Sequence, residues 1–354
     1  MCKILRYSIC ISHYVLTYLA FCHPLECTIR AFSTTPVSQQ HNCWLIVDFD
    51  GTCTEKDTTP LLPKLAAEFS KDNESERLKR LNTFASLENE YFDLYNTAMS
   101  NIFVDGSKVS MKNALESLDD VSSTITKKLS DSGVLFGMSQ TQSDYEDLVD
   151  YRGDKDENNF DEKSKLRKGC AEALANLIDQ GWNFGVLSIN WCPQLIGAVL
   201  LRPVSNIYSA IPERRNRKYA QHSFLPKVWS NHVSIDGIVK LEVPGANAKK
   251  ERIASLKDSS QYRGDSNQIP FIVYIGDSST DLLALLEADV GILIGSSQTV
   301  SKFAERWNVA LSPLSSKSQE VTSTRQGQSS TVWTVNSWGE IEQFLSQILL
   351  NFSS

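Results

Sequence analysis

The sequence predicts an α/β fold, in which a parallel sheet has helices on both faces and carries an inserted, mainly helical cap. Three observations support this fold class. Short, continuous apolar runs recur along the chain, as expected for buried strands of a parallel sheet. Helical patterns separate the later runs, which is typical of strand–helix–strand units. A long helical stretch follows the first run, and we expect it to lie over the carboxyl ends of the strands, where open α/β sheets bind ligands.

The first element is the apolar run 44–47, which predicts a strand that is buried on both faces. A largely helical stretch follows from 58 to 165, with its clearest patterns at 61–69 and 78–95. The last part of this stretch, 144–165, is acidic and polar and contains a glycine, so we expect a linker or an exposed loop.

The pattern changes after residue 165. Apolar residues between 166 and 178 share one face of a helix that Gly181 can end. The other predicted elements follow in chain order: strand 184–187, strand 271–275, helix 281–288, strand 290–294, loop 315–330, edge strand 332–335 and closing helix 338–350. We therefore predict a catalytic core built from 44–57 and 166–354, a cap with its linker at 58–165, and a leader at 1–43.

The leader is predicted from charge. The first 43 residues contain three basic side chains and one acidic one, whereas the whole chain has a net charge of -7. A basic, acid-poor start is typical of a targeting segment. The favoured interpretation is an organelle presequence, mitochondrial or other, cut after Phe32. The alternatives are a secretory signal with small residues around 20–22, or a cytoplasmic protein with a disordered start.

Composition excludes several classes of protein. With 41% hydrophobic and 22% charged residues, the chain is not mainly disordered, and its acidic balance argues against a general nucleic-acid binder. Polar residues dilute the apolar part of the leader, so no stable membrane span is expected in the mature protein. The last four cysteines, at 43, 53, 170 and 192, are scattered and show no metal-ligand spacing, and we expect buried thiols there.

Pairs of carboxylates follow two of the apolar runs. Asp48 and Asp50 come directly after the first strand, and side chains two residues apart in extended chain project the same way. Asp277 and Asp281 follow strand 271–275 and lie one helical turn apart. Like charges held so close repel unless a cation binds or one group is protonated. Converging acids without a histidine cluster suit Mg²⁺.

A serine and a lysine complete an ordered set with these acids. Ser188 ends strand 184–187, and the adjacent Lys249 and Lys250 begin a helical pattern. Each element is common alone, but the combination in this order resembles the haloacid dehalogenase (HAD) superfamily of phosphohydrolases, whose core is a Rossmann-like sheet. The resemblance implies a Mg²⁺-dependent phosphomonoester hydrolase that acts on a small phosphorylated metabolite.

The resemblance also implies a role for each residue. Asp48 would be the nucleophile that forms an aspartyl-phosphate, and Asp50 the general acid and base. Ser188 and Lys249 would hold the phosphoryl oxygens. Mg²⁺ would bind Asp48, the backbone carbonyl of Asp50, and Asp277, while Asp281 would orient the lysine or a metal-bound water. Because neighbouring helical positions point about 100° apart, only one of Lys249 and Lys250 can face the site; Lys249 is preferred, and the sequence leaves the choice between them open.

The motifs around Phe49–Thr54, Leu187–Cys192 and Val273–Ser297 resemble more closely the phosphatase domains of the plant bifunctional thiamin-salvage family. That likeness makes thiamin monophosphate the leading substrate. The alternatives are another small phosphate, such as a sugar phosphate or phosphoserine, and a non-catalytic protein that binds a metabolite. Trp191 could stack on an aromatic substrate ring or serve as a core residue. The basic segment 203–227 is an apparent insertion and is expected to be a solvated loop.

Overall fold

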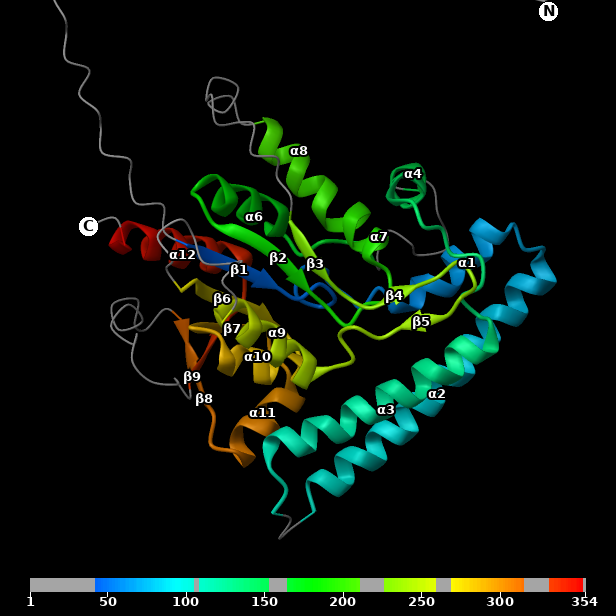
Figure 1. Cartoon of the computed structure of the whole chain (residues 1–354), viewed down its shortest axis with the longest axis horizontal. Coiled ribbons are helices and arrows are strands. Elements are labelled where there is room, and N and C mark those ends of the chain that lie inside the picture. Colours follow the sequence, from blue (N-terminus) through cyan, green and yellow to red (C-terminus); the bar gives the residue numbers. More distant parts are fainter. Residues whose placement is uncertain are drawn as a thin grey trace, which may run out of the picture. The chain divides into compact units, whose positions relative to one another are not determined.

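The structure, a computed structural model, describes residues 42–104, 108–152, 164–210, 226–258, 269–314 and 331–352. Within these residues, seven strands form one parallel sheet (Figure 1). In spatial order the strands are β3 (Lys227–Trp229), β2 (Asn183–Leu187), β1 (Cys43–Val47), β6 (Phe271–Gly276), β7 (Val290–Ile294), β9 (Thr331–Val335) and β8 (Ala310–Pro313). Each neighbouring pair is parallel. The predicted fold class is therefore confirmed.

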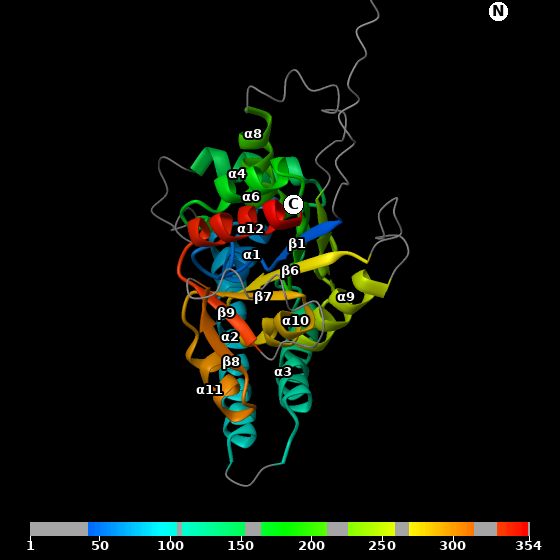
Figure 2. The same cartoon turned by 90° about the vertical axis from the view of Figure 1, so that its left-hand side faces the viewer.

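Helices cover both faces of this sheet, and its inner strand β1 is accordingly apolar on both sides. Cys43, Leu45 and Val47 of β1 belong to one buried cluster, and Trp44 and Ile46 belong to another. The first cluster packs against α6 (Cys170–Asp179), α7 (Pro193–Ile196), α8 (Arg202–Ala210) and α12 (Trp338–Phe352). The second packs against α9 (Ala246–Asp258), α10 (Leu282–Glu287) and α11 (Gln298–Arg306), on the opposite side of the sheet in Figure 2.

The stretch between β1 and β2 is mainly helical, as predicted. Its described part contains α1 (Leu62–Ser70), α2 (Glu74–Ile102), α3 (Met111–Ser132) and α4 (Gln142–Arg152), and α6 follows them before β2. The long helices α2 and α3 pack side by side in both views (Figures 1 and 2). A capping box starts α2, in which Asn73 and Glu76 satisfy each other's backbone N–H groups. That 58–165 forms a separate cap stays a prediction, since Leu61, Leu62 and Leu65 share the buried cluster of the sheet.

Aromatic rings connect the end of α2 to the core. The Phe103 ring meets the Phe303 ring edge-on at 5.4 Å, and Phe303 stacks on Trp307 at 5.0 Å. The guanidinium of Arg306 lies 5.5 Å from the Phe103 ring and 5.2 Å from the Trp307 ring. Such contacts add to the stabilisation from buried area alone, so they hold the far end of the α2–α3 pair against α11.

Three sequence predictions need correction. The strand at 332–335 is not at the sheet edge, because β8 pairs with its outer side. The short and half-exposed β8 has no apolar run by which it could be predicted. Part of the expected linker, up to Arg152, is helix α4, and the start of the 203–227 segment is helix α8. Residues 153–163 and 211–225 of these segments, the loop 315–330 and residues 1–41 of the leader lie outside the described residues.

A short antiparallel pair, β4 (His232–Val233) and β5 (Val239–Lys240), was also not predicted. The four cysteines at 43, 53, 170 and 192 are all buried, which confirms the expected buried thiols. Within the described residues, no helix combines the length and the apolar character that crossing a bilayer requires.

Candidate active site

The candidate site lies at the carboxyl ends of three neighbouring strands. Asp48 follows β1, Ser188 follows β2 and Asp277 follows β6. Because β2, β1 and β6 are adjacent and parallel, their carboxyl ends meet at one edge of the sheet. This is the edge at which open α/β sheets bind ligands.

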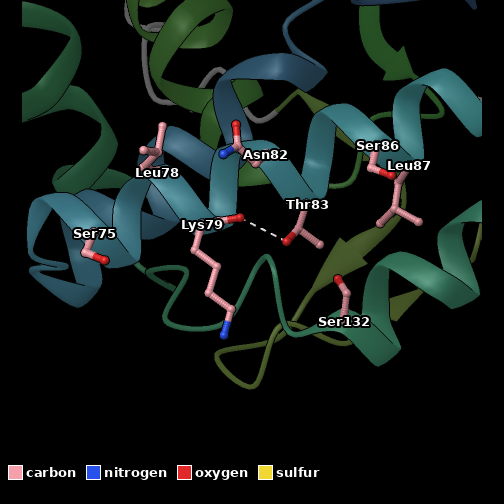
Figure 3. Close-up of a pocket in the computed structure, with 8 residues that line it drawn as sticks. All are labelled: Ser75, Leu78, Lys79, Asn82, Thr83, Ser86, Leu87 and Ser132. Carbon is pink, nitrogen blue, oxygen red and sulfur yellow. Dashed lines mark hydrogen bonds between the residues drawn. The ribbon is translucent and has the colours of Figure 1, made fainter.

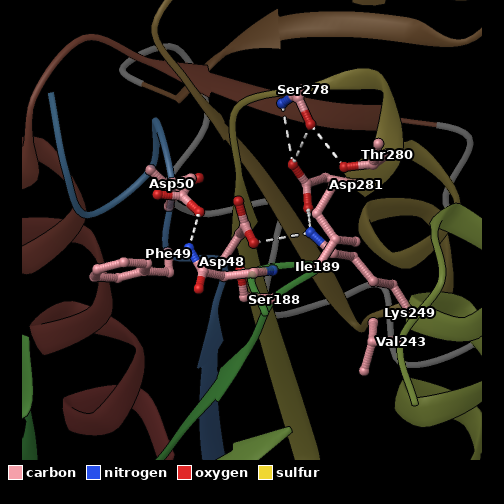
Figure 4. Close-up of polar contacts among 12 residues, drawn as sticks. Asp48, Phe49, Asp50, Ser188, Ile189, Val243, Lys249, Ser278, Thr280 and Asp281 are labelled. Atoms are coloured by element: carbon pink, nitrogen blue, oxygen red, sulfur yellow. Dashed lines mark hydrogen bonds and ion pairs between the residues drawn. The ribbon is translucent and has the colours of Figure 1, made fainter. Parts of the chain in front are cut away.

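Lys249 joins this group from helix α9. Its Nζ lies 2.8 Å from Oδ1 of Asp48 and 2.7 Å from Oδ1 of Asp281, and its side chain is fully buried (Figure 4). The side chain of Lys250 is 42% exposed, and its Nζ lies 3.8 Å from the carboxylate of Glu287. Of the two adjacent lysines, Lys249 is the one that meets the carboxylates.

Asp281 is held by five hydrogen bonds. Its Oδ1 accepts from Lys249 and from the hydroxyl of Tyr274, at 2.7 and 2.6 Å. Its Oδ2 accepts from the backbone N–H groups of Asp277 and Ser278 and from the Ser278 hydroxyl, at 3.1, 3.0 and 2.9 Å. Both oxygens are therefore engaged within the protein. This arrangement suits a residue that orients Lys249 better than one that binds a ligand directly.

Asp50 has a different set of partners from Asp48. The backbone N–H and the hydroxyl of Thr58 donate to its Oδ1 at 2.8 and 2.6 Å, and Nδ2 of Asn190 donates to its Oδ2 at 2.7 Å. Burial raises the pKa of Asp50 to about 7, with a further contribution from the nearby Asp57, although these hydrogen bonds oppose the shift. A carboxyl with such a pKa can give and take a proton near neutral pH.

The other charged groups show how burial and pairing compete. Burial raises the pKa of Asp48 to about 6, with Lys249 opposing the shift, and raises that of Asp277 to about 8, with repulsion from Asp281 and Asp48. Burial works to lower the pKa of Lys249, but Asp281 and Asp48 hold it above its ordinary value. Burial likewise works to raise the pKa of Asp281, but Lys249 holds it below the usual range. The site therefore contains one firm ion pair, Lys249 with Asp281, beside carboxylates that burial makes weaker acids.

The turn after β1 is anchored on three sides. Gly51 adopts a φ of 73° and accepts a hydrogen bond at its carbonyl oxygen from Nε of Arg167, at 2.7 Å. A Cβ at position 51 would fall 2.4 Å from Oδ2 of Asp277, so glycine is needed for that close approach. Nε1 of Trp338 donates to the carbonyl of Thr52 at 3.2 Å, and the Thr52 hydroxyl donates to Asp277 at 2.8 Å.

Three of the carboxylates could hold a metal ion. One oxygen from each of Asp48, Asp277 and Asp281 lies within 4.8 Å of the others. The set contains only oxygen donors, which suits a hard divalent cation. Because both oxygens of Asp281 are already engaged, Asp48 and Asp277 are the carboxylates best placed to bind it. The residues present therefore fit a Mg²⁺-type ion.

Ser188 is fully buried, and its backbone N–H donates to the carbonyl of Trp229 at 2.9 Å. Its hydroxyl oxygen accepts from the backbone N–H of Asn190 at 3.2 Å. It follows β2 at the same edge of the sheet as Asp48 (Figure 4). Trp191 is half-buried and packs on the hydrophobic cluster under the sheet, so a substrate contact by its ring stays a prediction.

Sequence reasoning missed several partners of the carboxylates. Thr58 and Asn190 hold Asp50, while Tyr274 holds Asp281. Asn190 stands two residues after Ser188, the same spacing as that between Asp48 and Asp50. This repeated spacing could have identified Asn190 as a residue of the site. Tyr274 stands inside the apolar run of β6, where nothing distinguishes it from a core residue.

A separate shallow hollow lies along α2 and the end of α3, lined by α2 side chains between Ser75 and Leu87 and by Ser132 (Figure 3). It contains no carboxylate, histidine or cysteine. The Thr83 hydroxyl in it donates to the carbonyl of Lys79 in its own helix, at 2.9 Å. The hollow therefore offers no groups for the chemistry described above.

No family model matches the chain. Among curated proteins, it is 26% identical over 327 residues to the "Bifunctional TH2 protein, mitochondrial" of Arabidopsis thaliana. This match covers 84% of the chain but 48% of the relative, so the chain spans about half of that protein's length. This match agrees with the resemblance to the HAD phosphatases that the motifs carry. The resemblance predicted from the motifs is thereby confirmed.

Solved structures similar to the chain include a substrate-bound phosphoserine phosphatase, with 14% identity, a TM-score of 0.40, and coverage of 74% of this chain and 90% of that one. A phosphoserine phosphatase from T. onnurineus has 13% identity and a TM-score of 0.36, and the match covers 87% and 96% of the two chains. Likeness at this level says nothing about the substrate.

Proposed function

We propose that the chain is a phosphomonoester hydrolase with Asp48 as its nucleophile. The observation that carries the proposal is the meeting of Asp48, Asp277 and Lys249 at the carboxyl edge of the sheet. Asp48 is close to the lysine, while Asp50, two residues later, has a separate set of neutral donors. Two carboxylates in unlike environments suit two unlike roles.

The proposed reaction has two steps. In the first, a carboxylate oxygen of Asp48 attacks phosphorus, the bond to the ester oxygen breaks, and Asp50 gives its proton to the leaving oxygen. In the second, water attacks the phosphorus of the aspartyl-phosphate, gives a proton to Asp50, and releases phosphate and free Asp48. Lys249 and the Ser188 hydroxyl hold phosphoryl oxygens, and the cationic Lys249 offsets the charge that spreads over them.

Mg²⁺ is the proposed cofactor. Asp48, Asp277 and the backbone carbonyl of Asp50 would hold it, and Asp281 would orient Lys249. Bound Mg²⁺ would supply positive charge that screens the repulsion between the carboxylates and the phosphoryl group.

Thiamin monophosphate is the leading substrate. The support is the motif resemblance to the plant thiamin-salvage family, together with the match to a plant protein. The other candidates are a sugar phosphate or phosphoserine, and a non-catalytic role in metabolite binding. A mitochondrial location is proposed from the basic leader and from the relative's printed name.

The purified full chain with Mg²⁺ and p-nitrophenyl phosphate tests the reaction class. We expect release of p-nitrophenol, and no release above background would overturn the proposal in favour of metabolite binding. A panel of thiamin monophosphate, sugar phosphates and phosphoserine then tests the substrate. We expect the highest kcat/KM for thiamin monophosphate, and a clearly higher value for another compound would replace it.

The buried carboxylates predict how metal and pH act together on stability. Burial raises the pKa values of Asp50 to about 7 and of Asp277 to about 8, well above the ordinary aspartate value of 3.8. The folded, metal-free protein therefore keeps protons that the unfolded chain releases, so its free energy of unfolding falls as pH rises from about 4 to about 8. Mg²⁺ binds ionised carboxylates, so it should raise the Tm more at pH 8 than at pH 6.

Thermal unfolding in EDTA or in Mg²⁺ at the two pH values checks this expectation. Asp277→Asn should remove most of the Mg²⁺ effect. Asp289→Asn is the matched control, because Asp289 precedes β7 at the opposite edge of the sheet. A Mg²⁺ effect that is independent of pH, or that survives Asp277→Asn, would contradict the proposed metal site.

A further inference from the structure

One carboxylate from helix α3 lies at the start of helix α9, which carries Lys249. Oδ1 of Asp119 accepts from the backbone N–H of Ala246 at 3.1 Å, and its Oδ2 accepts from that of Asn247 at 3.4 Å. These are the first two residues of α9. The first N–H groups of a helix have no partner within the helix, and a carboxylate there also interacts favourably with the helix dipole. Asp119 therefore caps α9 from a different part of the chain.

The residue before α9 is shaped for this contact. Gly245 has no side chain with which to cap the helix, and a Cβ there would fall 1.9 Å from Oδ1 of Asp119. The backbone at Gly245 lies outside the left-handed region, so the absence of a side chain provides space and not an unusual conformation. Glycine at this position has no side chain that could cap α9, and it leaves space for the Asp119 carboxylate from α3.

The capped turn is the one that places the catalytic lysine. The backbone N–H of Lys249 donates to the carbonyl of Gly245 at 3.1 Å, so the lysine stands at the end of the first helical turn. Its Nζ must reach Asp48 and Asp281 together, at 2.8 and 2.7 Å. A small displacement or fraying of this turn moves the ammonium group away from the two carboxylates.

We propose that Asp119 is a positioning residue, which caps α9 from the α2–α3 pair and thereby holds Lys249 at the phosphate-binding site. The catalytic part of this inference rests on the proposed function. Its consequence is that the helices inserted between β1 and β2 contribute directly to the geometry of the core site.

Amide hydrogen exchange tests the cap without any substrate. Asp119→Ala should speed exchange in the first turn of α9, residues 246–249, by about fivefold, because a lost N-cap weakens the helix end by that order. Asp119→Asn keeps an oxygen acceptor and should preserve most of the protection. Asp120→Ala is the matched control, since Asp120 is the exposed neighbour of Asp119 on α3. Unchanged exchange in Asp119→Ala, or an equal change in Asp120→Ala, would overturn the inference.

Kinetics with p-nitrophenyl phosphate and Mg²⁺ tests the consequence for Lys249. Asp119→Ala should lower kcat by about fivefold with KM changed by less than about twofold, and Asp119→Asn should restore most of the rate. A change confined to KM, or no rescue by Asp119→Asn, would overturn the positioning role. If the wild-type chain hydrolyses nothing, the proposed function fails, while the exchange experiment still decides whether Asp119 caps α9.

Gly245→Ala tests the contact between Asp119 and the first turn of α9 by a change at the residue before the helix. It should displace the Asp119 carboxylate and reproduce the faster exchange while leaving Asp119 in the chain. Because both substitutions remove one interaction, the effect of the double variant should be smaller than the sum of the two single effects. Additive effects would show that Gly245 and Asp119 act separately and would overturn the proposal. This variant also covers the case in which Asp119→Ala does not fold.

Discussion

Asp48→Asn should lower kcat for p-nitrophenyl phosphate by at least about 10⁴-fold, because an amide oxygen is a poor nucleophile toward phosphorus. The substitution keeps the size of the side chain. Lys249 retains its 2.7 Å contact with Asp281, so the buried lysine keeps a charged partner and the fold should survive. Steady-state kinetics at saturating Mg²⁺ gives the rate, and thermal unfolding checks the fold.

The matched control is again Asp289→Asn, which makes the same chemical change at the amino edge of the sheet. Asp289 accepts from the backbone N–H of Ile272 at 2.7 Å, and an asparagine oxygen can also accept this bond. Its kcat should stay within about twofold of wild type. After acid quenching during turnover, wild type should carry a phosphoryl group on the peptide that contains Asp48. A substantial rate or a phosphorylated peptide in Asp48→Asn would exclude Asp48 as the nucleophile.

The second large effect is expected for Lys249→Ala. Loss of a buried cation that faces the phosphoryl group should lower kcat by about 10²- to 10³-fold. The same change leaves Asp48 and Asp281 without their shared partner in a buried site. Removing one member of such a group typically costs about 3 kcal/mol of unfolding free energy. Kinetics and denaturant unfolding measure the two effects separately.

Lys250→Ala supplies the comparison within the same helix turn. Lys250 is 42% exposed and makes only a 3.8 Å contact with Glu287, so its loss should cost less than about 1 kcal/mol and leave kcat within about twofold. If Lys250→Ala reduces kcat as strongly as Lys249→Ala, the assignment of Lys249 as the phosphate-binding lysine is wrong.

Strands with a strong apolar run could be predicted from the sequence. The strand at 290–294 agrees with β7 at both ends, and the run at 44–47 gives β1 to within one residue. Central strands of a parallel sheet must be apolar on both faces, and such strands appear in the sequence as continuous apolar runs. The edge strands β3 and β8 have no such requirement, and their half-exposed residues carry no comparable pattern. This difference explains why 332–335 was placed at the edge.

The carboxylates of the site were also accessible from sequence, because each directly follows a predicted strand. Their hydrogen-bond partners were not. Thr58 reaches Asp50 only through the fold of the turn after β1, and Tyr274 is hidden in an apolar run. Asp119 is 127 residues away from Ala246 along the chain. Such contacts depend on the packing of distant elements, which local patterns do not report.

The anchoring of the turn after β1 has a consequence for the order in which the protein can fold during synthesis. Thr52 leaves the ribosome well before Trp338, whose indole donates to its carbonyl from 286 residues further along the chain. The central strand β1 must likewise wait for β2 and β6 before it has neighbours on both sides. Contacts between residues so far apart slow folding, because long loops must close before they form. Asp48, the proposed nucleophile, is thus made before the strands β2 and β6 and the Trp338 indole that complete its surroundings.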